Sequence, residues 1–334
     1  MRISFAKLQN TLRRVLLTHG FGGQEAELGS LLVAETDLDG VYSHGINRFP
    51  RFVEQVRSGV VDVEAEPSFV SGSAAVERWD GGAGAGNVTA HRSMERAMEL
   101  SDTHGIGLVA LRNTNHWMRG GSYGWQAAEK GKIGICWTNT MPNLPPWGSS
   151  EPRVGNKPLV VAIPRAEGHV VLDSAMSMFS YGALASYRNQ GKSLPVDGGY
   201  DASDELTRQP AEVEASSRPL PAGFWKGSGL AMVLDMIAAL LSDGRATHEI
   251  APDPTRESGL SQTFIAIDSR GPFGMAVEQE TVVDRIVEHV QNSELAAGHD
   301  RVNYPGERTL ATRLENQELG IPVDPDVWHA VQTL

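Results

Sequence analysis

A serine, a histidine and an arginine near the N-terminus have the spacing expected for proton transfer at an acidic substrate. His44 follows Ser43 directly, and Arg48 comes four residues later. Histidine exchanges a proton near neutral pH, and arginine can bind a carboxylate through two parallel hydrogen bonds. These residues therefore form a candidate catalytic site. The alternative is a histidine that ends a helix, next to a surface arginine.

A second histidine lies in a polar turn after a short apolar segment. His116 is preceded by Asn115 and followed by Arg119 and two glycines at 120–121. Active-site groups collect at strand ends in α/β proteins, and glycine lets the backbone approach a ligand closely. The turn is either a second part of an active site or a polar turn on which Trp117 packs.

Two glycine-rich segments could bind a nucleotide. Residues 81–86 contain four glycines, but their spacing is not that of a dinucleotide fingerprint, so we expect a turn before a helix. Lys226 precedes the strongest apolar helical segment, 229–241. Free amides at a helix N-terminus attract phosphate, and the lysine adds a positive charge. The alternative is an ordinary helix start with a surface lysine.

Two aspartates could complete such a site. Asp173 follows the apolar segment 170–172, where an acidic side chain could contact a ribose. Asp197 could orient a catalytic histidine or form an ordinary turn. No metal site is expected, because the ten histidines are scattered and Cys136 is the single cysteine.

The composition limits the classes of protein. The chain has 334 residues, 40% of them hydrophobic and 21% charged, which is globular composition and enough for about two domains. A net charge of −12 would repel a phosphate backbone, so nucleic-acid binding is not expected. No apolar run reaches the roughly 18 residues of a membrane span, and the basic N-terminus is not typical of a secretory signal. We expect a cytoplasmic protein without membrane partners.

Apolar periodicity predicts the elements that would position these residues. Three helices are expected in the first 60 residues, ending near Gly20, Gly40 and Gly59. Strands are expected at 107–111, 133–137, 158–163, 170–173 and 263–267, and further helices at 89–104, 125–129, 180–189, 229–241 and 309–319. The polar segments 196–222 and 243–260 are expected to be surface loops.

This order of elements predicts an α/β or α+β fold with a mixed sheet. We expect a helical domain built from residues 1–75 and 305–334. A mixed-sheet domain would span residues 76–304.

Several motifs together are similar to those of a known family. They are Tyr42-Ser43-His44-Gly45, Asn115-His116, Pro145-Pro146-Trp147-Gly148, Gly155-Asn156-Lys157-Pro158, Leu194-Pro195-x-Asp197 and Lys226-Gly227-x-Gly229. Over essentially its whole length the sequence resembles the second type of malate/L-lactate dehydrogenase, NAD(P)H-dependent 2-oxoacid reductases without a Rossmann fold. The resemblance implies reduction of a small sugar acid or another 2-oxo acid. It also implies that the mixed-sheet domain 76–304 is a cofactor-binding domain of non-Rossmann type, in a cytoplasmic homodimer whose subunits share the active site.

The resemblance also implies roles for individual residues. The proton donor would be His44, or His116 as in some relatives. From the residue types themselves we expect Arg48 to bind the substrate carboxylate and Ser43 to hold the imidazole or the carbonyl. His116 would polarise the carbonyl or share the role of the acid, and Asp197 would orient one histidine. The coenzyme-binding residues implied are His169, Val170, Val171, Leu172, Asp173, Ser174, Ala175, Trp225, Lys226, Gly306, Glu307 and Arg308.

The coenzyme is expected to be NAD, with NADH preferred over NADPH. Lys157 stands where the family often has asparagine, and it would favour NADPH if it contacted an adenosine phosphate.

Two alternatives lie outside redox chemistry. A metal-dependent sugar-acid isomerase or hydrolase would need metal-ligand spacing that the sequence lacks. A carbohydrate-binding module would have no need of the general acid that His44, Arg48 and His116 together indicate.

Overall fold

The N-terminal helices form where apolar residues recur at helical spacing, and a glycine follows each of them. In the computed structural model, which describes residues 1–269 and 278–334, they are α1 (Phe5–Thr18), α2 (Gly23–Leu38) and α3 (Phe49–Arg57). Gly20, Gly40 and Gly59 adopt a positive φ, which ends a helix with little strain when the residue is glycine. The three predicted helices and their ends are confirmed.

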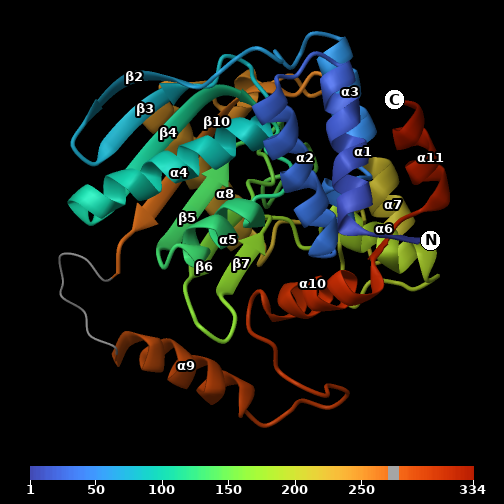
Figure 1. Ribbon diagram of the computed structural model, residues 1–334. Helices are drawn as coiled ribbons and strands as arrows, with labels where there is room; N and C mark the ends of the chain where they lie inside the picture. Colours follow the sequence, from blue (N-terminus) through green and yellow to red (C-terminus); the bar gives the residue numbers. More distant parts are fainter. Residues whose placement is uncertain (270–277) are drawn as a thin grey trace.

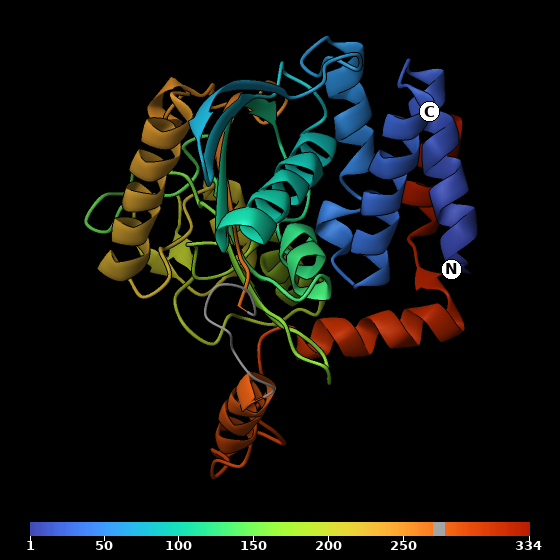
Figure 2. The same cartoon turned by 60° about the vertical axis from the view of Figure 1, so that its left-hand side comes forward.

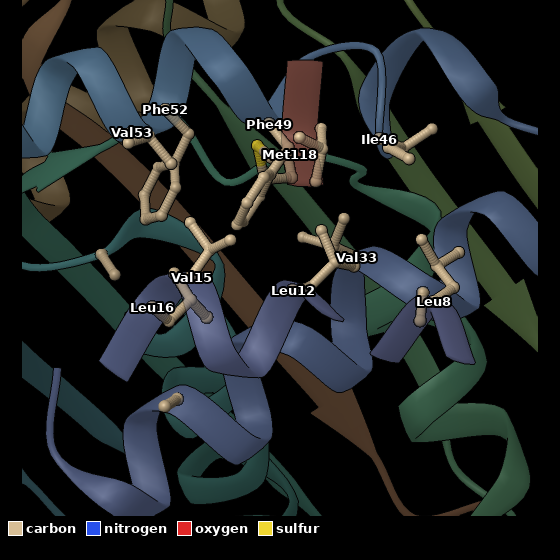
Figure 3. Packing of buried hydrophobic residues seen from close by; sticks show 14 of the residues in the cluster. Leu8, Leu12, Val15, Leu16, Val33, Ile46, Phe49, Phe52, Val53 and Met118 are labelled. Atoms are coloured by element: carbon tan, nitrogen blue, oxygen red, sulfur yellow. The ribbon is translucent and has the colours of Figure 1, made fainter. Parts of the chain in front are cut away.

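The C-terminal segment packs against these helices (Figure 1). β1 (Arg2–Ile3) pairs with β11 (Ile321–Pro322), and α11 (Pro325–Thr333) lies beside α1 and α3. Leu12, Phe49 and Trp328 belong to one buried cluster, and Figure 3 shows the side chains at its centre. The cluster includes Met118 from the turn after His116, so the helical layer extends to the candidate site.

A seven-stranded mixed sheet forms the rest of the body. Its strands are β2 (Ser68–Ser73), β3 (Val76–Asp80), β4 (Ile106–Asn115), β5 (Ile133–Thr138), β6 (Leu159–Ile163), β7 (Val170–Ser174) and β10 (Ser258–Ile267). The spatial order is β2-β3-β4-β10-β5-β6-β7; β3 and β4 run parallel, and the other neighbours run antiparallel. The predicted mixed α/β fold is confirmed.

Helices cover both faces of this sheet (Figure 2). α4 (Gly86–His104) and α5 (Gly121–Glu129) pack on one face and α8 (Trp225–Ser242) on the other. Side chains alternate between the faces along β10: Phe264 lies in the α4–α5 core, whereas Ile265 packs with Leu234 and Ala238 of α8. Among the described residues α8 is the one helix with the length and composition of a membrane span, and 28% of it is buried.

Two expected loops contain regular structure. Residues 196–222 hold β8 (Gly199–Tyr200), β9 (Leu206–Thr207) and α7 (Pro210–Ser216), and Val213 of α7 is buried against Leu184 of α6 (Tyr181–Asn189). Within 243–260, a short 3-10 helix, η2 (Thr247–Glu249), precedes β10, which begins earlier than predicted. Both loop predictions are wrong because these elements are short and gain stability from tertiary contacts rather than from their own periodicity.

The sequence analysis also missed the β2–β3 hairpin and α9 (Glu278–Gln291), which projects from the body in Figure 1. All six residues of β2 are exposed, so it carries no apolar alternation. The predicted helix at 309–319 is confirmed as α10 (Glu307–Leu319). The division into two domains stays a prediction. β2 belongs to the large sheet although residues 68–73 were assigned to the helical domain.

The contact between α4 and β4 depends on a residue without a side chain. A Cβ on Gly107 would lie 2.0 Å from the carbonyl oxygen of Ala97. We therefore expect Gly107→Ala to lower the free energy of unfolding by about 1–3 kcal/mol, because helix and strand must separate. Gly229→Ala is the control, since a Cβ there meets nothing within 4 Å. Urea denaturation should find this control neutral or slightly stabilised, and equal losses in both variants would contradict the close approach.

Candidate active site

The fold brings the two candidate histidines together. His44 ends the short 3-10 helix η1 (Tyr42–His44) between α2 and α3, and His116 directly follows β4. Their ring centroids are 6.1 Å apart, and their planes are inclined by 22°. Two segments that are distant in sequence therefore present one pair of imidazoles.

The hydrogen bonds of His116 indicate its tautomer. Its Nδ1 accepts a hydrogen bond of 3.0 Å from the backbone N–H of Met118, so a neutral ring carries its proton on Nε2. Burial, followed by the positive charges of Arg48 and His44, lowers the pKa of His116 well below its ordinary value. At neutral pH His116 is therefore uncharged, with an N–H to donate.

His44 holds a proton more readily than His116. Its Nδ1 lies 2.9 Å from the Oγ of Ser43. Burial and then the charge of Arg48 lower the pKa of His44, but the carboxylate of Asp173 opposes them and raises it. The pKa of His44 is thus lowered less strongly than that of His116.

Arg48 is a half-buried cation beside the histidines. Burial lowers its pKa to about 10, so the guanidinium stays charged at neutral pH. Its Nη2 lies 3.6 Å from the carboxylate of Glu257, whose side chain is also buried and accepts from the N–H of Met141. The sequence analysis missed Glu257 because it lies in a segment that was assigned to a loop.

A buried ion-pair network holds the turn after His116 against the helices. Asp39, directly after α2, pairs with Arg119 on one side and with Arg313 of α10 on the other, at 2.9 Å. Arg313 also contacts Glu35 of α2 at 3.1 Å. Asp39 carried no recognisable signal in the sequence, because its partners come from two distant segments.

A cleft of about 470 Å³ adjoins this network. Its lining includes Val171, Leu172, Asp173, Gly306 and Arg308 from two of the predicted coenzyme-binding segments. The remaining lining residues are Val41, Arg119, Trp125, Asn303, Tyr304, Pro305 and Thr309. The volume is within the range of small-molecule sites, so the cleft could hold part of a dinucleotide.

Backbone contacts join the two segments that line the cleft. The N–H of Val171 donates to the carbonyl of Pro305 at 2.9 Å. Gly306 has a φ of 96°, and a Cβ there would lie 3.0 Å from the backbone nitrogen of Val171. Asp173, which lines the cleft, accepts a hydrogen bond from the N–H of Gly121 at 2.8 Å, and the negative charge of its carboxylate acts on His44.

The rest of the predicted coenzyme set lies around or beyond the cleft. His169, Val170, Ser174, Ala175 and Glu307 flank the lining residues in the chain. Trp225 and Lys226, at the start of α8, do not line it, and Trp225 is 66% exposed. The start of α8 is nevertheless joined to the end of the first segment, because the N–H of Ala222 donates to the carbonyl of Met176 at 2.8 Å.

Two predicted residues have other partners. The Oδ1 of Asp197 lies 3.2 Å from the Nε of Arg208 at the surface, which replaces the predicted contact with a histidine. Lys157 is fully buried, with its ammonium 3.3 Å from Asp235 and in contact with Thr247. The interpretation of Lys157 as a contact to an adenosine phosphate is therefore wrong, because the side chain points into the protein.

A second cleft, of about 390 Å³, lies between the ends of β3, β4 and α8. Neither His44 nor His116 lines either cleft, and Arg112 in the second cleft is paired with Asp80 at 3.0 Å and Asp243 at 3.1 Å. Within residues 1–269 and 278–334 no cluster of three or more metal-ligating side chains is found.

Comparison with known proteins decides the family. The sequence profile described as malate/L-lactate dehydrogenase matches residues 3–332. The chain belongs to this family. It is 48% identical to the 2,3-diketo-L-gulonate reductase of Citrobacter koseri, and the match covers both chains completely.

Solved structures of family relatives have the same fold. Sulfolactate dehydrogenase from Methanocaldococcus jannaschii superposes with a TM-score of 0.90 at 27% identity, covering 99% of this chain and 95% of its own. Delta1-piperideine-2-carboxylate reductase from Pseudomonas syringae pvar. tomato gives 0.87 at 26% identity, covering 100% and 99%. The resemblance inferred from the motifs is confirmed, and the protein is an oxidoreductase of the malate/L-lactate dehydrogenase family.

The field of Asp173 at His44 can be tested by titration. Asp173→Asn removes a negative charge but keeps an oxygen that can accept from Gly121, so the pKa of His44 should fall further. The pKa is read from the pH dependence of the His44 imidazole signal in NMR spectra. Asp197→Asn is the control and should leave that signal unchanged. A raised pKa of His44 in the Asp173 variant would contradict the placement.

Proposed function

We propose that the protein is a nicotinamide-dependent reductase that converts 2,3-diketo-L-gulonate to 3-dehydro-L-gulonate. The observation that supports this best is the histidine pair beside the half-buried Arg48. This arrangement stands in a chain 48% identical, over its full length, to a reductase named for that substrate. A sugar acid offers a carboxylate for the arginine and an adjacent keto group for the histidines.

Arg48 would bind the carboxylate at C1 of the substrate. Its guanidinium stays charged, and Glu257 holds it from one side at 3.6 Å. A carboxylate bound there would bring the C2 keto oxygen near the imidazoles, where Ser43 would fix either the ring of His44 or the keto oxygen. Binding through a charged arginine is expected to orient the substrate as well as to attract it.

The nicotinamide coenzyme, when bound, supplies a hydride to the keto carbon. Residues 171–173 with Gly306 and Arg308 would hold it in the cleft that adjoins Asp173, and Trp225 with Lys226 would extend that site. Because Lys157 is buried against Asp235, it offers no contact to an adenosine phosphate, and we propose NADH rather than NADPH.

His44 would protonate the keto oxygen as negative charge develops on it. A well-placed general acid contributes about 10²–10⁴-fold to such a step. The neutral His116 would donate a hydrogen bond from Nε2 to the same oxygen. The protonated form of His44 is the active one, so the rate of reduction should fall as the pH rises through its lowered pKa.

A simpler substrate is the second candidate. The relatives of the same fold are named for sulfolactate and for delta1-piperideine-2-carboxylate, so a 2-oxo acid such as pyruvate or oxaloacetate, or a cyclic imino acid, is an alternative. All of these carry the carboxylate that Arg48 would bind, so the substrates differ in the part beyond the keto or imino carbon.

One assay, which follows oxidation of the coenzyme by its absorbance, tests both the identity of the substrate and the role of His44 as general acid. We expect NADH oxidation with 2,3-diketo-L-gulonate but not with pyruvate or oxaloacetate, and weaker activity with NADPH. His44→Gln should lower kcat by about 10²–10⁴-fold while the Kd of NADH stays unchanged.

Two further variants serve as comparisons in this assay. His116→Gln should have a smaller effect than His44→Gln, and Asp197→Asn should behave like the unchanged protein. Oxidation of NADH with the simple oxo acids alone would discard the sugar acid. Full turnover in the His44 variant would assign the proton to His116.

We further propose a homodimer in which a second copy covers α8. Met232, Met236 and Leu240 form a stripe at helical spacing on the outer face of α8, between 49% and 76% exposed. The other large apolar side chains exposed around this stripe are Trp147, Phe224, Trp225, Leu230 and Val233. Exposed apolar side chains gathered in this way are typical of an interface, to which one partner usually contributes about 800 Å².

A dimer of this kind would place the partner beside Trp225 and Lys226. This would account for two coenzyme-binding candidates that lie outside the cleft of a single chain. The cytoplasmic location stays a prediction of the sequence.

Charge on the outer face of α8 should separate the two copies. Met236→Glu with Leu240→Glu is expected to halve the mass seen by sedimentation, because buried carboxylates would face each other. The control is Leu314→Glu on α10, at a side chain that is 57% exposed, and its mass should not change. A dimer that persists with both glutamates present would show that another surface joins the copies.

A further inference from the structure

A buried acid lies directly beneath the turn that carries the candidate proton donor. Asp37, near the end of α2, is fully buried. Its Oδ2 accepts a hydrogen bond of 2.8 Å from the backbone N–H of Ile46, two residues after His44. Its Oδ1 is also buried and has no hydrogen-bond partner in the part of the chain that the structure describes. The carboxyl group thus makes a contact with the turn and is not engaged by a cation.

The same carboxyl group explains the glycine that follows His44. A Cβ on Gly45 would lie 2.2 Å from the Oδ1 and 2.6 Å from the Oδ2 of Asp37. No side chain fits at position 45 beside the carboxyl group of Asp37. Glycine at this position therefore allows the backbone of the turn to pack directly against that carboxyl group. The carboxyl group of Asp37 and Gly45 therefore pack against each other. This contact holds the turn that carries His44 close to α2.

A second contact holds the start of the turn. The Nδ2 of Asn316, from α10, donates to the carbonyl of Leu38 at 2.9 Å and to the Oη of Tyr42 at 3.3 Å. Asn316 thereby fixes the residue before Ser43, whereas Asp37 fixes the residues after His44. The turn is held at both ends by buried polar side chains.

We propose that Asp37 is a positioning residue for the reduction: it holds the turn 42–46 so that His44 faces His116. This inference rests on the proposed role of His44. Asp37 does not touch the candidate substrate site, so it would act through the backbone.

The charge state of Asp37 distinguishes this role from an electrostatic one. Burial raises the pKa of Asp37 well above its ordinary value, although the hydrogen bond from Ile46 opposes it. The charged side chains of the adjoining network, Asp39, Arg119 and Arg313, pair with one another. The raised pKa favours the uncharged form of the carboxyl group, which would position the turn without adding to the electric field at His44. An amide could do the same.

Two substitutions separate position from charge. Asp37→Ala removes the acceptor of the Ile46 N–H and leaves a space beneath Gly45. We expect kcat to fall on the order of 100-fold, the usual result of a small misplacement, while the Kd of NADH stays unchanged. Asp37→Asn keeps an oxygen in place and should restore kcat to within about threefold, a difference of less than 1 kcal/mol in the barrier. The pH profile of the reaction should not move.

A matched control shows whether lower stability alone could account for a fall in kcat. Leu12→Ala empties a fully buried site in the same core cluster, but Leu12 belongs to α1 and not to α2 or to the turn 42–46. It should lower Tm as Asp37→Ala does and leave kcat nearly unchanged at temperatures well below Tm. An equal fall in kcat in the Leu12→Ala variant would contradict a positioning role for Asp37 and would leave it a purely structural one.

A double-mutant cycle tests the contact with Gly45. When Asp37 is present, Gly45→Ala should lower kcat, because the added methyl group meets the carboxyl group of Asp37. The same change should cost less on top of Asp37→Ala, since the space is then free. Additive losses would overturn the proposal, as would a shifted pH profile in Asp37→Asn. If His44→Gln kept full activity, the proposed role of His44 would be wrong. The NMR signal of the His44 imidazole, compared between the protein with Asp37 and the Asp37→Ala variant, would still show whether Asp37 holds the turn.

Discussion

The ion-pair network around Asp39 is the constraint on which the candidate site depends. One carboxylate, directly after α2, pairs with Arg119 from the turn after β4 and with Arg313 from α10. A buried guanidinium without a partner is costly, so each arginine holds its segment at the carboxylate. These ion pairs hold the helical layer and the large sheet in one relative position. His44 comes from the helical layer and His116 from the end of β4, so the two rings would not face each other if this position changed.

The electrostatics of the site combine two opposed requirements. Positive charge from Arg48 suits an acidic substrate, but it also lowers the pKa of both histidines. Asp173 partly restores the proton affinity of His44, and Glu257 stabilises the charge of Arg48. The result is an unequal pair, with one ring that is easier to protonate and one that stays neutral. Such a division suits a proton donor and a hydrogen-bond donor that act on the same oxygen.

The two faces of α8 have different roles in the structure. Leu234 and Ala238 pack on the sheet, and Asp235 holds the buried Lys157. The opposite face carries exposed apolar side chains at helical spacing, and a gathered apolar surface of this kind is typical of an interaction site. A second copy on that face would also border Trp225 and Lys226. Coenzyme binding and association of the copies would then depend on the same helix.

The sequence by itself determined the class of fold, the three N-terminal helices with their glycine ends, and the residue types at the site. These features are encoded locally, in apolar spacing and in short motifs such as Ser43-His44-Gly45. Tertiary structure alone decided which of these residues meet. It paired His44 with His116, placed Glu257 beside Arg48 and Asp37 beneath Gly45, and gave Asp197 and Lys157 other partners. Contacts between distant segments, and the burial that shifts a pKa, depend on how helices and strands pack, and spacing along the chain does not contain that information.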